Sequence, residues 1–274
     1  MKYTVQSSKY ILKNFWYILP FAVIPALLLS FSTDEQAMKT VLQYLYEGKL
    51  QAIAFSDIFR AISVLNFGSW KSVLFGLLAI VVIIFCVALM MALLEKHMRI
   101  GKRTFNGVFS KLNDNFISTC GYGILLVAIY EVWCLITAAL LYLVSMIQTL
   151  ILAYVMIGLF FIAMHVVLIY LIGLIYLWLP CMQITGFRPL EALHYSYHLI
   201  APVKWLILLG QIVILFAMEV LIVLCVVLTP NEVAFTVLTT VLYTLLIMIY
   251  CVRMQIAYFD RDNIERADLR GYYR

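Results

Sequence analysis

Six long apolar blocks divide the sequence, and each is long enough to cross a lipid bilayer as an α-helix. They cover approximately residues 15–31, 72–94, 120–144, 150–179, 205–229 and 233–257. A hydrocarbon core about 30 Å thick needs about 20 helical residues at about 1.5 Å each. Inside that core each helix must satisfy its own backbone polar groups. The blocks therefore predict an all-α polytopic membrane bundle of six transmembrane helices.

Composition and cysteine placement agree with this class. Charged residues make up 12% of the chain, against about 25% in an ordinary soluble domain. The six cysteines lie inside or at the ends of apolar blocks, and no two have CxxC spacing. We therefore expect free packing thiols, with no disulfide framework, metal site or cofactor. The net charge is +5, but the basic residues lie beside the spans, where membrane orientation needs them. The charge therefore indicates no nucleic-acid partner.

Basic residues lie mostly on one side of the predicted spans. The N-terminal segment, the 95–115 and 180–204 loops and the tail hold 15 of the 19 lysines and arginines. The other side has Lys39, Lys49, Arg60 and Lys71, balanced by four acidic residues. The positive-inside rule therefore predicts a multi-pass protein of the cytoplasmic (inner) cell membrane, with both termini in the cytoplasm.

The 32–71 loop is the one sizeable segment predicted on the outer side. Ser32-Thr33-Asp34-Glu35 is typical of a capping box, and Gly48 is expected to end the helix that it opens. A second amphipathic stretch runs from Ser56 to Phe67 and is expected to stop near Gly68. Two helices lying on the outer membrane surface are the favoured interpretation, and a lid over a cavity between the spans is the alternative.

Three spans begin in a similar way, with an expected short surface helix followed by a basic residue and an aromatic one. These interfacial anchors are Lys13 and Trp16, Lys111 and Phe116, and Lys204 and Trp205. Aromatic and basic residues both favour the membrane interface. Their recurrence every 90–100 residues predicts three repeated units of interfacial helix plus helical hairpin in one membrane domain, residues 1–274. The hairpins cover about 1–94, 95–180 and 181–258, and a cytoplasmic tail covers 259–274.

Three short segments of the sequence carry a family resemblance. They are Lys13-Asn14-Phe15-Trp16 with its preceding surface helix, Gly186-Phe187-Arg188-Pro189-Leu190-Glu191-Ala192-Leu193, and Ala257-Tyr258-Phe259-Asp260-Arg261. Together they resemble the membrane domain of bacterial glycerophosphoryl diester phosphodiesterases and related six-helix bacterial membrane proteins. In those enzymes the chemistry belongs to a separate barrel domain. The resemblance therefore implies a membrane scaffold and no catalytic residues here.

Glu131, His165 and Glu219 each lie near the middle of a predicted span. A charge at that depth costs at least about 2.5–3.5 kcal/mol, so such residues usually face the bundle interior. We expect all three to point inward and at least two to lie within hydrogen-bond or water-bridged reach. They form either a substrate, ion or proton site or a structural hydrogen-bond pair between helices, and the sequence leaves both open.

Other polar residues are weaker candidates. His194 and His198 are four residues apart on an expected helix, but no further ligand motif lies nearby, so no metal is expected. Pro20 and Pro25 are expected to kink the first span. Phosphate-binding loops, HExxH and GxSxG motifs do not occur. The chain is therefore predicted not to be an enzyme.

Two functions follow from these features. The first is an integral membrane scaffold or accessory protein of the bacterial cytoplasmic membrane, which docks partners through its inner-surface helices. The alternative is a transporter or permease subunit with a mid-membrane polar site, and an ATPase partner is one variant of it. The expected partners are thus the lipid bilayer and a membrane protein or ATPase, and the oligomeric state is left open.

Overall fold

The protein is an all-helical bundle in a computed structural model that describes residues 2–269, without the side chains of residues 111, 112, 114 and 115. Its long helices are α1 (Lys2–Ser32), α4 (Trp70–Ile100), α5 (Val108–Ser145), α6 (Leu150–Leu174), α9 (Lys204–Leu228) and α10 (Glu232–Arg261). Its shorter helices are α2 (Glu35–Glu47), α3 (Phe55–Ile62), α7 (Trp178–Thr185) and α8 (Pro189–Ile200). The described part holds six helical stretches long and apolar enough to span a membrane, which confirms the predicted fold class.

The link between α4 and α5 differs from the expected interfacial helix. Gly101 ends α4 and Gly107 precedes α5, both in the left-handed backbone region that favours glycine. Residues 102–107 between them are not helical, and Lys111 already belongs to α5, so no separate surface helix precedes this span in the described residues. The superposition of the three hairpins as repeats stays a prediction.

The kink in α1 lies at Asn14. This residue has non-helical dihedrals (φ −120°, ψ 20°), whereas Pro20 and Pro25 lie within continuous helix. The Asn14 amide donates to the carbonyl of Tyr10 at 2.9 Å and accepts from Arg103 Nε at 2.8 Å. Arg103 Nη2 also donates to the carbonyl of Lys13 at 3.0 Å. The bend is therefore held by a side chain from the α4–α5 link.

Three helices form the inner part of the bundle. Buried residues make up 56% of the most apolar stretch of α4, 44% of that of α10 and 33% of that of α1. The corresponding shares are 22% for α5 and 17% for both the α6–α7 and the α8–α9 stretch. The main apolar core joins α1, α4, α7 and α10 near the ends that carry the termini, and its largest fully buried side chains include Tyr176, Tyr258, Phe259, Met90 and Met91.

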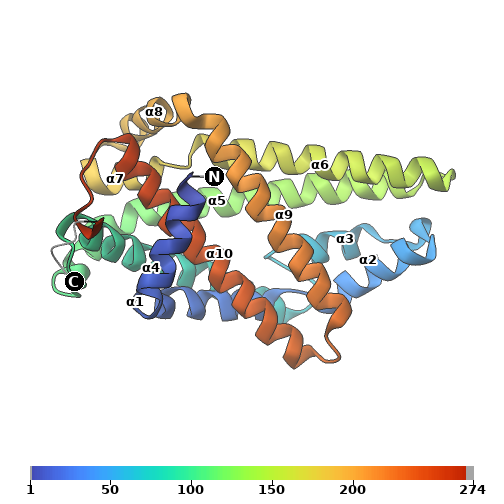
Figure 1. The fold of residues 1–274 in the computed structure, drawn as a ribbon. Coiled ribbons are helices and arrows are strands. Elements are labelled where there is room, and N and C mark those ends of the chain that lie inside the picture. Colours follow the sequence, from blue (N-terminus) through green and yellow to red (C-terminus); the bar gives the residue numbers. More distant parts are fainter. Residues whose placement is uncertain (1, 270–274) are drawn as a thin grey trace.

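The start of α1 and the end of α10 lie together. Lys2 Nζ is 2.8 Å from Asp260 Oδ1, and the Tyr3 hydroxyl donates to Asp260 Oδ2 at 2.8 Å. Figure 1 shows α7 and α8 at this same end of the bundle, which we call the terminal end. The α5–α6 and α9–α10 turns lie at the other end, which we call the far end, together with α2 and α3 (Figure 1).

The hairpin of α2 and α3 does not lie flat across the far end. Phe55, at the start of α3, contacts the ring of Tyr142, whereas the carbonyl of Ile62, at its end, accepts from the Tyr130 hydroxyl at 2.6 Å. Because Tyr142 and Tyr130 are twelve residues apart on α5, α3 runs lengthwise along the far half of that helix (Figure 1). The favoured expectation of a surface-lying helix is therefore wrong for α3, and for α2 it stays a prediction.

The helix boundaries in this hairpin also differ from the sequence expectation. The N-cap of α2 is Asp34, whose carboxylate accepts from the Ala37 N–H at 2.9 Å, and not Ser32 as the capping-box pattern implied. Gly48 ends α2 in the left-handed region, as predicted. The second helix stops at Ile62, well before Gly68.

Candidate functional site

His165 of α6 and Glu219 of α9 meet in the middle of their spans. His165 Nε2 lies 2.6 Å from Glu219 Oε1, and His165 is completely buried. Its Nδ1 lies 2.7 Å from the carbonyl oxygen of Phe161, which only accepts, so Nδ1 carries a proton. One further proton is then shared between Nε2 and Oε1. Two of the three mid-span residues thus come within hydrogen-bond reach, as predicted.

Aromatic rings enclose this pair. The ring centre of Phe161 lies 4.1 Å from that of His165, the Trp133 ring 4.9 Å and the Phe216 ring 5.2 Å. The Trp133 indole N–H donates to the carbonyl of Met164 at 2.7 Å, which fixes α5 against α6. The second carboxylate oxygen of Glu219, Oε2, is buried and has no hydrogen-bond partner among the described residues. The pair can therefore hold or pass a proton in apolar surroundings.

Glu131 binds a different part of the chain. Its Oε1 accepts from the backbone N–H groups of Val64 (3.0 Å) and Leu65 (3.1 Å), and its Oε2 accepts from the Ser63 hydroxyl at 2.7 Å. Glu131 stands about half way along the span Phe116–Ser145. Residues 63–65 therefore reach the middle of the bundle, where a backbone without helical hydrogen bonds needs an acceptor such as this carboxylate.

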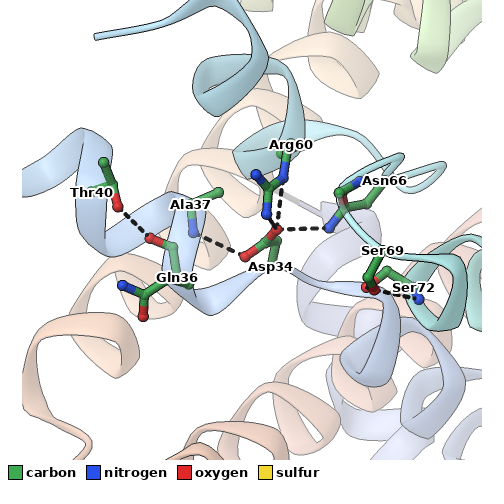
Figure 2. A network of polar contacts seen from close by, with 9 residues as sticks. Asp34, Gln36, Ala37, Thr40, Arg60, Asn66, Ser69 and Ser72 are labelled. Carbon is green, nitrogen blue, oxygen red and sulfur yellow. Dashed lines mark hydrogen bonds and ion pairs between the residues drawn. The ribbon is translucent and has the colours of Figure 1, made fainter. Parts of the chain in front are cut away.

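A second polar cluster ties the same segment at the far end. Asp34 Oδ2 accepts from Arg60 Nη2 (2.6 Å), Arg60 Nε (3.0 Å) and Asn66 Nδ2 (3.1 Å). Figure 2 shows Arg60 and Asn66 pointing at this carboxylate from either side. Burial alone would raise the pKa of Asp34, but the hydrogen bonds from Ala37, Asn66 and Arg60 outweigh it and hold that pKa below its usual value. Asp34 is therefore an ionised anchor for the segment.

A pocket of about 530 Å³ opens beside this cluster. It lies between the end of α1, the starts of α2 and α4, Arg60 of α3 and the turn before α10. Most of its lining side chains are polar: Ser30, Thr33, Asp34, Glu35, Gln36, Lys39, Arg60, Ser69, Ser72, Asn231, Glu232 and Thr236. Hydroxyl, amide and charged groups of both signs can together bind a small polar solute.

Sequence reasoning did not single out Asp34, Arg60 or Asn66 as site residues. Arg60 entered only the charge balance of the loop, and Asp34 entered that balance and the capping-box pattern. A salt bridge between residues 26 positions apart leaves no local pattern. One local signal existed. The Asn66 Oδ1 accepts from the N–H of Gly68 at 2.7 Å, which is the turn that an Asn-x-Gly sequence favours.

The interfacial anchors lie on the outside of the bundle where the structure describes them. Trp16 and Trp205 are 81% and 74% exposed, and Phe116 is also exposed. Lys13 is exposed beside the α1 kink, and Lys204 Nζ lies 3.2 Å from the Tyr170 hydroxyl. The side chain of Lys111 falls outside the described residues. Exposed aromatic rings beside basic residues fit a membrane interface, although only Trp205 lies at the start of its helix.

The histidines of α8 and the cysteines hold no metal-type cluster in the described residues. His194 Nε2 and His198 Nε2 are 3.0 Å apart, but no third histidine, cysteine or carboxylate of the described part joins them. All six cysteines are free thiols, buried or half-buried.

Searches against protein-family models, curated proteins and solved structures found no match to this chain.

Proposed function

We propose that this membrane protein is a transporter or permease subunit that receives a small polar solute in the far-end pocket and has no catalytic activity of its own. The observation that carries this proposal is the path of residues 33–69. The Asp34–Arg60–Asn66 cluster ties this segment beside the pocket, and Glu131 binds it half way along α5. A solute that altered the contacts of Asp34 would therefore also alter the contacts of Glu131 with the same segment.

The mid-span pair supports the same function. His165 and Glu219 connect α6 to α9, and each can exchange a proton while staying in its hydrogen bond. Ionisable residues inside membrane spans commonly mark ion and proton pathways. In this proposal the pair couples a proton to a change in the packing of α6 against α9.

The proposal also includes an orientation. The pocket opens on the outer face of the bacterial cytoplasmic membrane, and both termini lie in the cytoplasm. The distribution of 15 basic residues on the terminal side against four on the other supports it.

The direct experiment is a screen of small polar solutes against the full-length protein in mild detergent. Amino acids, sugars, polyols and polyamines would be tested for a rise in the thermal unfolding temperature, because a ligand that binds only the folded state stabilises it. Thr236→Val and Glu232→Gln change two pocket side chains. Glu47→Gln is the matched control, since it removes an exposed charge from α2 outside the pocket.

A solute that stabilises the wild type and the control, but not the pocket variants, supports the binding step. Uptake of that solute into proteoliposomes then tests transport. If no solute stabilises the wild type, or if the pocket variants respond as the wild type does, the proposal fails.

A scaffold or accessory protein is the second candidate, and the low burial of α5, α6 and α9 favours it. Leu159 on α6 and Val213 on α9 are 59% and 50% exposed, so these helices offer much of their surface to lipid or to another membrane protein. The resemblance to the membrane domain of glycerophosphoryl diester phosphodiesterases, itself a proposal, points the same way.

Photo-crosslinking in native membranes separates the two candidates. A photoreactive residue at position 159 or 213 should give one discrete protein adduct if the chain is a scaffold, and lipid adducts only if it acts alone. Position 81 on α4 is the control, because Val81 is similarly exposed (66%) on a different helix. A partner that hydrolyses ATP would instead favour the permease variant.

A further inference from the structure

Arg253 of α10 is a buried charge without an ion-pair partner. It is 3% exposed, and its Nη2 donates to the carbonyl of Ile207 at 2.9 Å. Arginine is always charged in proteins. Among the described residues no carboxylate pairs with it, although a buried charge is costly unless an opposite charge and further hydrogen bonds compensate it.

Several other donors around Arg253 are also unused. Arg253 Nε, the Tyr176 hydroxyl and the Thr4 hydroxyl are buried atoms that find no hydrogen-bond partner in the described part of the chain. Tyr176 is fully buried, as is the guanidinium beside it, whose Cζ is 5.8 Å from the ring centre. A protein interior seldom leaves so many polar atoms of one region unsatisfied. The Arg253 guanidinium only donates and has the Ile207 carbonyl as its one acceptor among the described residues, and each hydroxyl has a proton to donate.

Gly210 of α9 shows that these groups converge. A Cβ placed on Gly210 would lie 2.3 Å from Arg253 Nη2 and 3.4 Å from Thr4 Oγ1. The guanidinium from α10 and the hydroxyl from α1 therefore meet over the same bare stretch of helix backbone. Gln211, the next residue, has a side-chain amide with both polar atoms buried and unbonded.

The position along the helices suggests where a ligand would come from. Gly210 is six residues after Lys204, where α9 begins, so it lies about 9 Å along the helix axis from that start. Trp205, 74% exposed, marks the same helix start as interfacial. Thr4 and Gln211 are half-buried, whereas Arg253 and Tyr176 are buried. A lipid headgroup at the interface would therefore have to reach about 9 Å inward along α9 to meet Arg253.

We infer that Arg253, Tyr176 and Thr4 form a binding site for a phosphate-type oxyanion with one negative charge. Guanidinium and hydroxyl donors suit tetrahedral oxyanions, and a single negative charge would balance the single arginine. The phosphodiester of an anionic lipid headgroup and free phosphate share this chemistry. The site lies at the terminal end of the bundle and does not depend on the proposed solute pocket.

The test uses the full-length protein in nanodiscs. Wild type would be placed in phosphatidylcholine alone, in phosphatidylcholine with phosphatidylglycerol, and in phosphatidylcholine with inorganic phosphate at constant ionic strength. Thermal unfolding and native mass spectrometry would report stabilisation and bound anion. Stabilisation by phosphatidylglycerol with retained lipid identifies the headgroup as the source, and stabilisation by inorganic phosphate alone identifies the free anion.

Tyr176→Phe and Thr4→Val test whether the two hydroxyl groups bind the anion. Each variant removes a hydroxyl that has no partner in the protein, so without a bound anion it should be neutral or slightly stabilising. With the anion, each should weaken anion binding roughly tenfold, since a hydrogen bond to a charged group is lost. Arg253→Gln should abolish it. Should that variant fail to fold, the two hydroxyl variants still decide the question.

Tyr243→Phe is the matched control, because it removes a buried hydroxyl that has a partner, Thr33, far from Arg253. It should lower stability equally with and without the anion. Equal behaviour of wild type in all three nanodiscs, or unchanged anion binding in Tyr176→Phe and Thr4→Val, would overturn the inference.

Discussion

The backbone of α4 at Gly76 lies directly against the carbonyl oxygen of Val64. A Cβ at position 76 would come within 2.5 Å of that oxygen, which is closer than real Cβ atoms approach. Val64 belongs to the stretch that Glu131 holds from the opposite side through its backbone N–H. Residues 63–65 are therefore packed against a glycine of α4 on one side and hydrogen-bonded to a carboxylate of α5 on the other.

Gly76→Ala should lower stability by about 1–3 kcal/mol, the usual cost of forcing an extra methyl group into a packed contact. Thermal unfolding in detergent would measure the loss. Gly158→Ala is the control, since nothing lies within 4 Å of a Cβ at that helical position of α6. The control should be neutral or slightly stabilising. Equal stabilities of the two variants would show that the contact with Val64 is loose.

Glu131→Leu should destabilise the protein by about 2–4 kcal/mol, because it leaves two backbone N–H groups and a hydroxyl without an acceptor. Glu131→Gln keeps one oxygen for the N–H groups of Val64 and Leu65, and its amide can donate to Ser63, so its stability should stay near that of the wild type. Yield and thermal unfolding give the comparison. If the leucine form were as stable as the glutamine form, the carboxylate would not be holding the segment.

His165 and Glu219 should be coupled in a double-mutant cycle. His165→Phe leaves the Glu219 carboxyl group without its partner, and Glu219→Leu leaves His165 Nε2 without one, whereas the double variant removes both groups. The coupling energy should be about 0.6–1.7 kcal/mol, the range measured for hydrogen bonds between membrane helices. Purely additive losses in thermal stability would mean that the contact at 2.6 Å contributes nothing.

Low pH should remove the stabilisation that the ionised Asp34 carboxylate gives to its cluster. The pKa of Asp34 is lowered in the folded protein by its hydrogen bonds with Ala37, Asn66 and Arg60, against the opposing effect of burial. Its contribution to stability is therefore fully present above the ordinary aspartate pKa of about 4 and is lost as pH falls through the lower folded value. The stability difference between wild type and Asp34→Asn should be constant near neutral pH and shrink in acid. A difference that grows in acid would reverse the assigned direction.

Labelling from one side of the membrane tests the orientation. Tyr46→Cys, at a position 93% exposed at the far end, should react with an impermeant thiol reagent added outside intact cells. Phe105→Cys, at a position 56% exposed in the link between α4 and α5, should react only after the cells are opened. The native cysteines, all buried or half-buried, give the background in the parent protein. The opposite pattern would overturn the positive-inside assignment.

The spans could be predicted from the sequence because hydropathy acts locally. A run of apolar residues must be helical in lipid whatever surrounds it, so all six spans were recognisable. The end of α3 was not, because it depends on a residue 67 positions away: Val64 leaves the helix pattern to bond Glu131. The α1 kink is similar, since Arg103 stabilises a bend at Asn14 that the prolines alone did not predict.

The same contrast between local signals and long-range contacts applies to the polar sites. His165 and Glu219 were found because the cost of ionisable groups in lipid singles them out wherever they pack. That Glu131 would take a separate partner could not be read from depth alone, because Ser63 and its neighbours were expected on the surface. Arg253 was counted only as a basic residue of the tail side, and its burial against Gly210 depends on how α9 and α10 pack.

The contacts that hold residues 63–65 between α4 and α5 also set an order of events during synthesis. The segment is synthesised before α5, so the carboxylate of Glu131 does not yet exist when residues 63–65 leave the ribosome. Until α5 has formed, the N–H groups of Val64 and Leu65 lack this acceptor, so the segment cannot yet take its place between the spans. Its packing between the spans is therefore a late step of assembly, and a chain truncated before α5 would leave residues 63–65 without this acceptor.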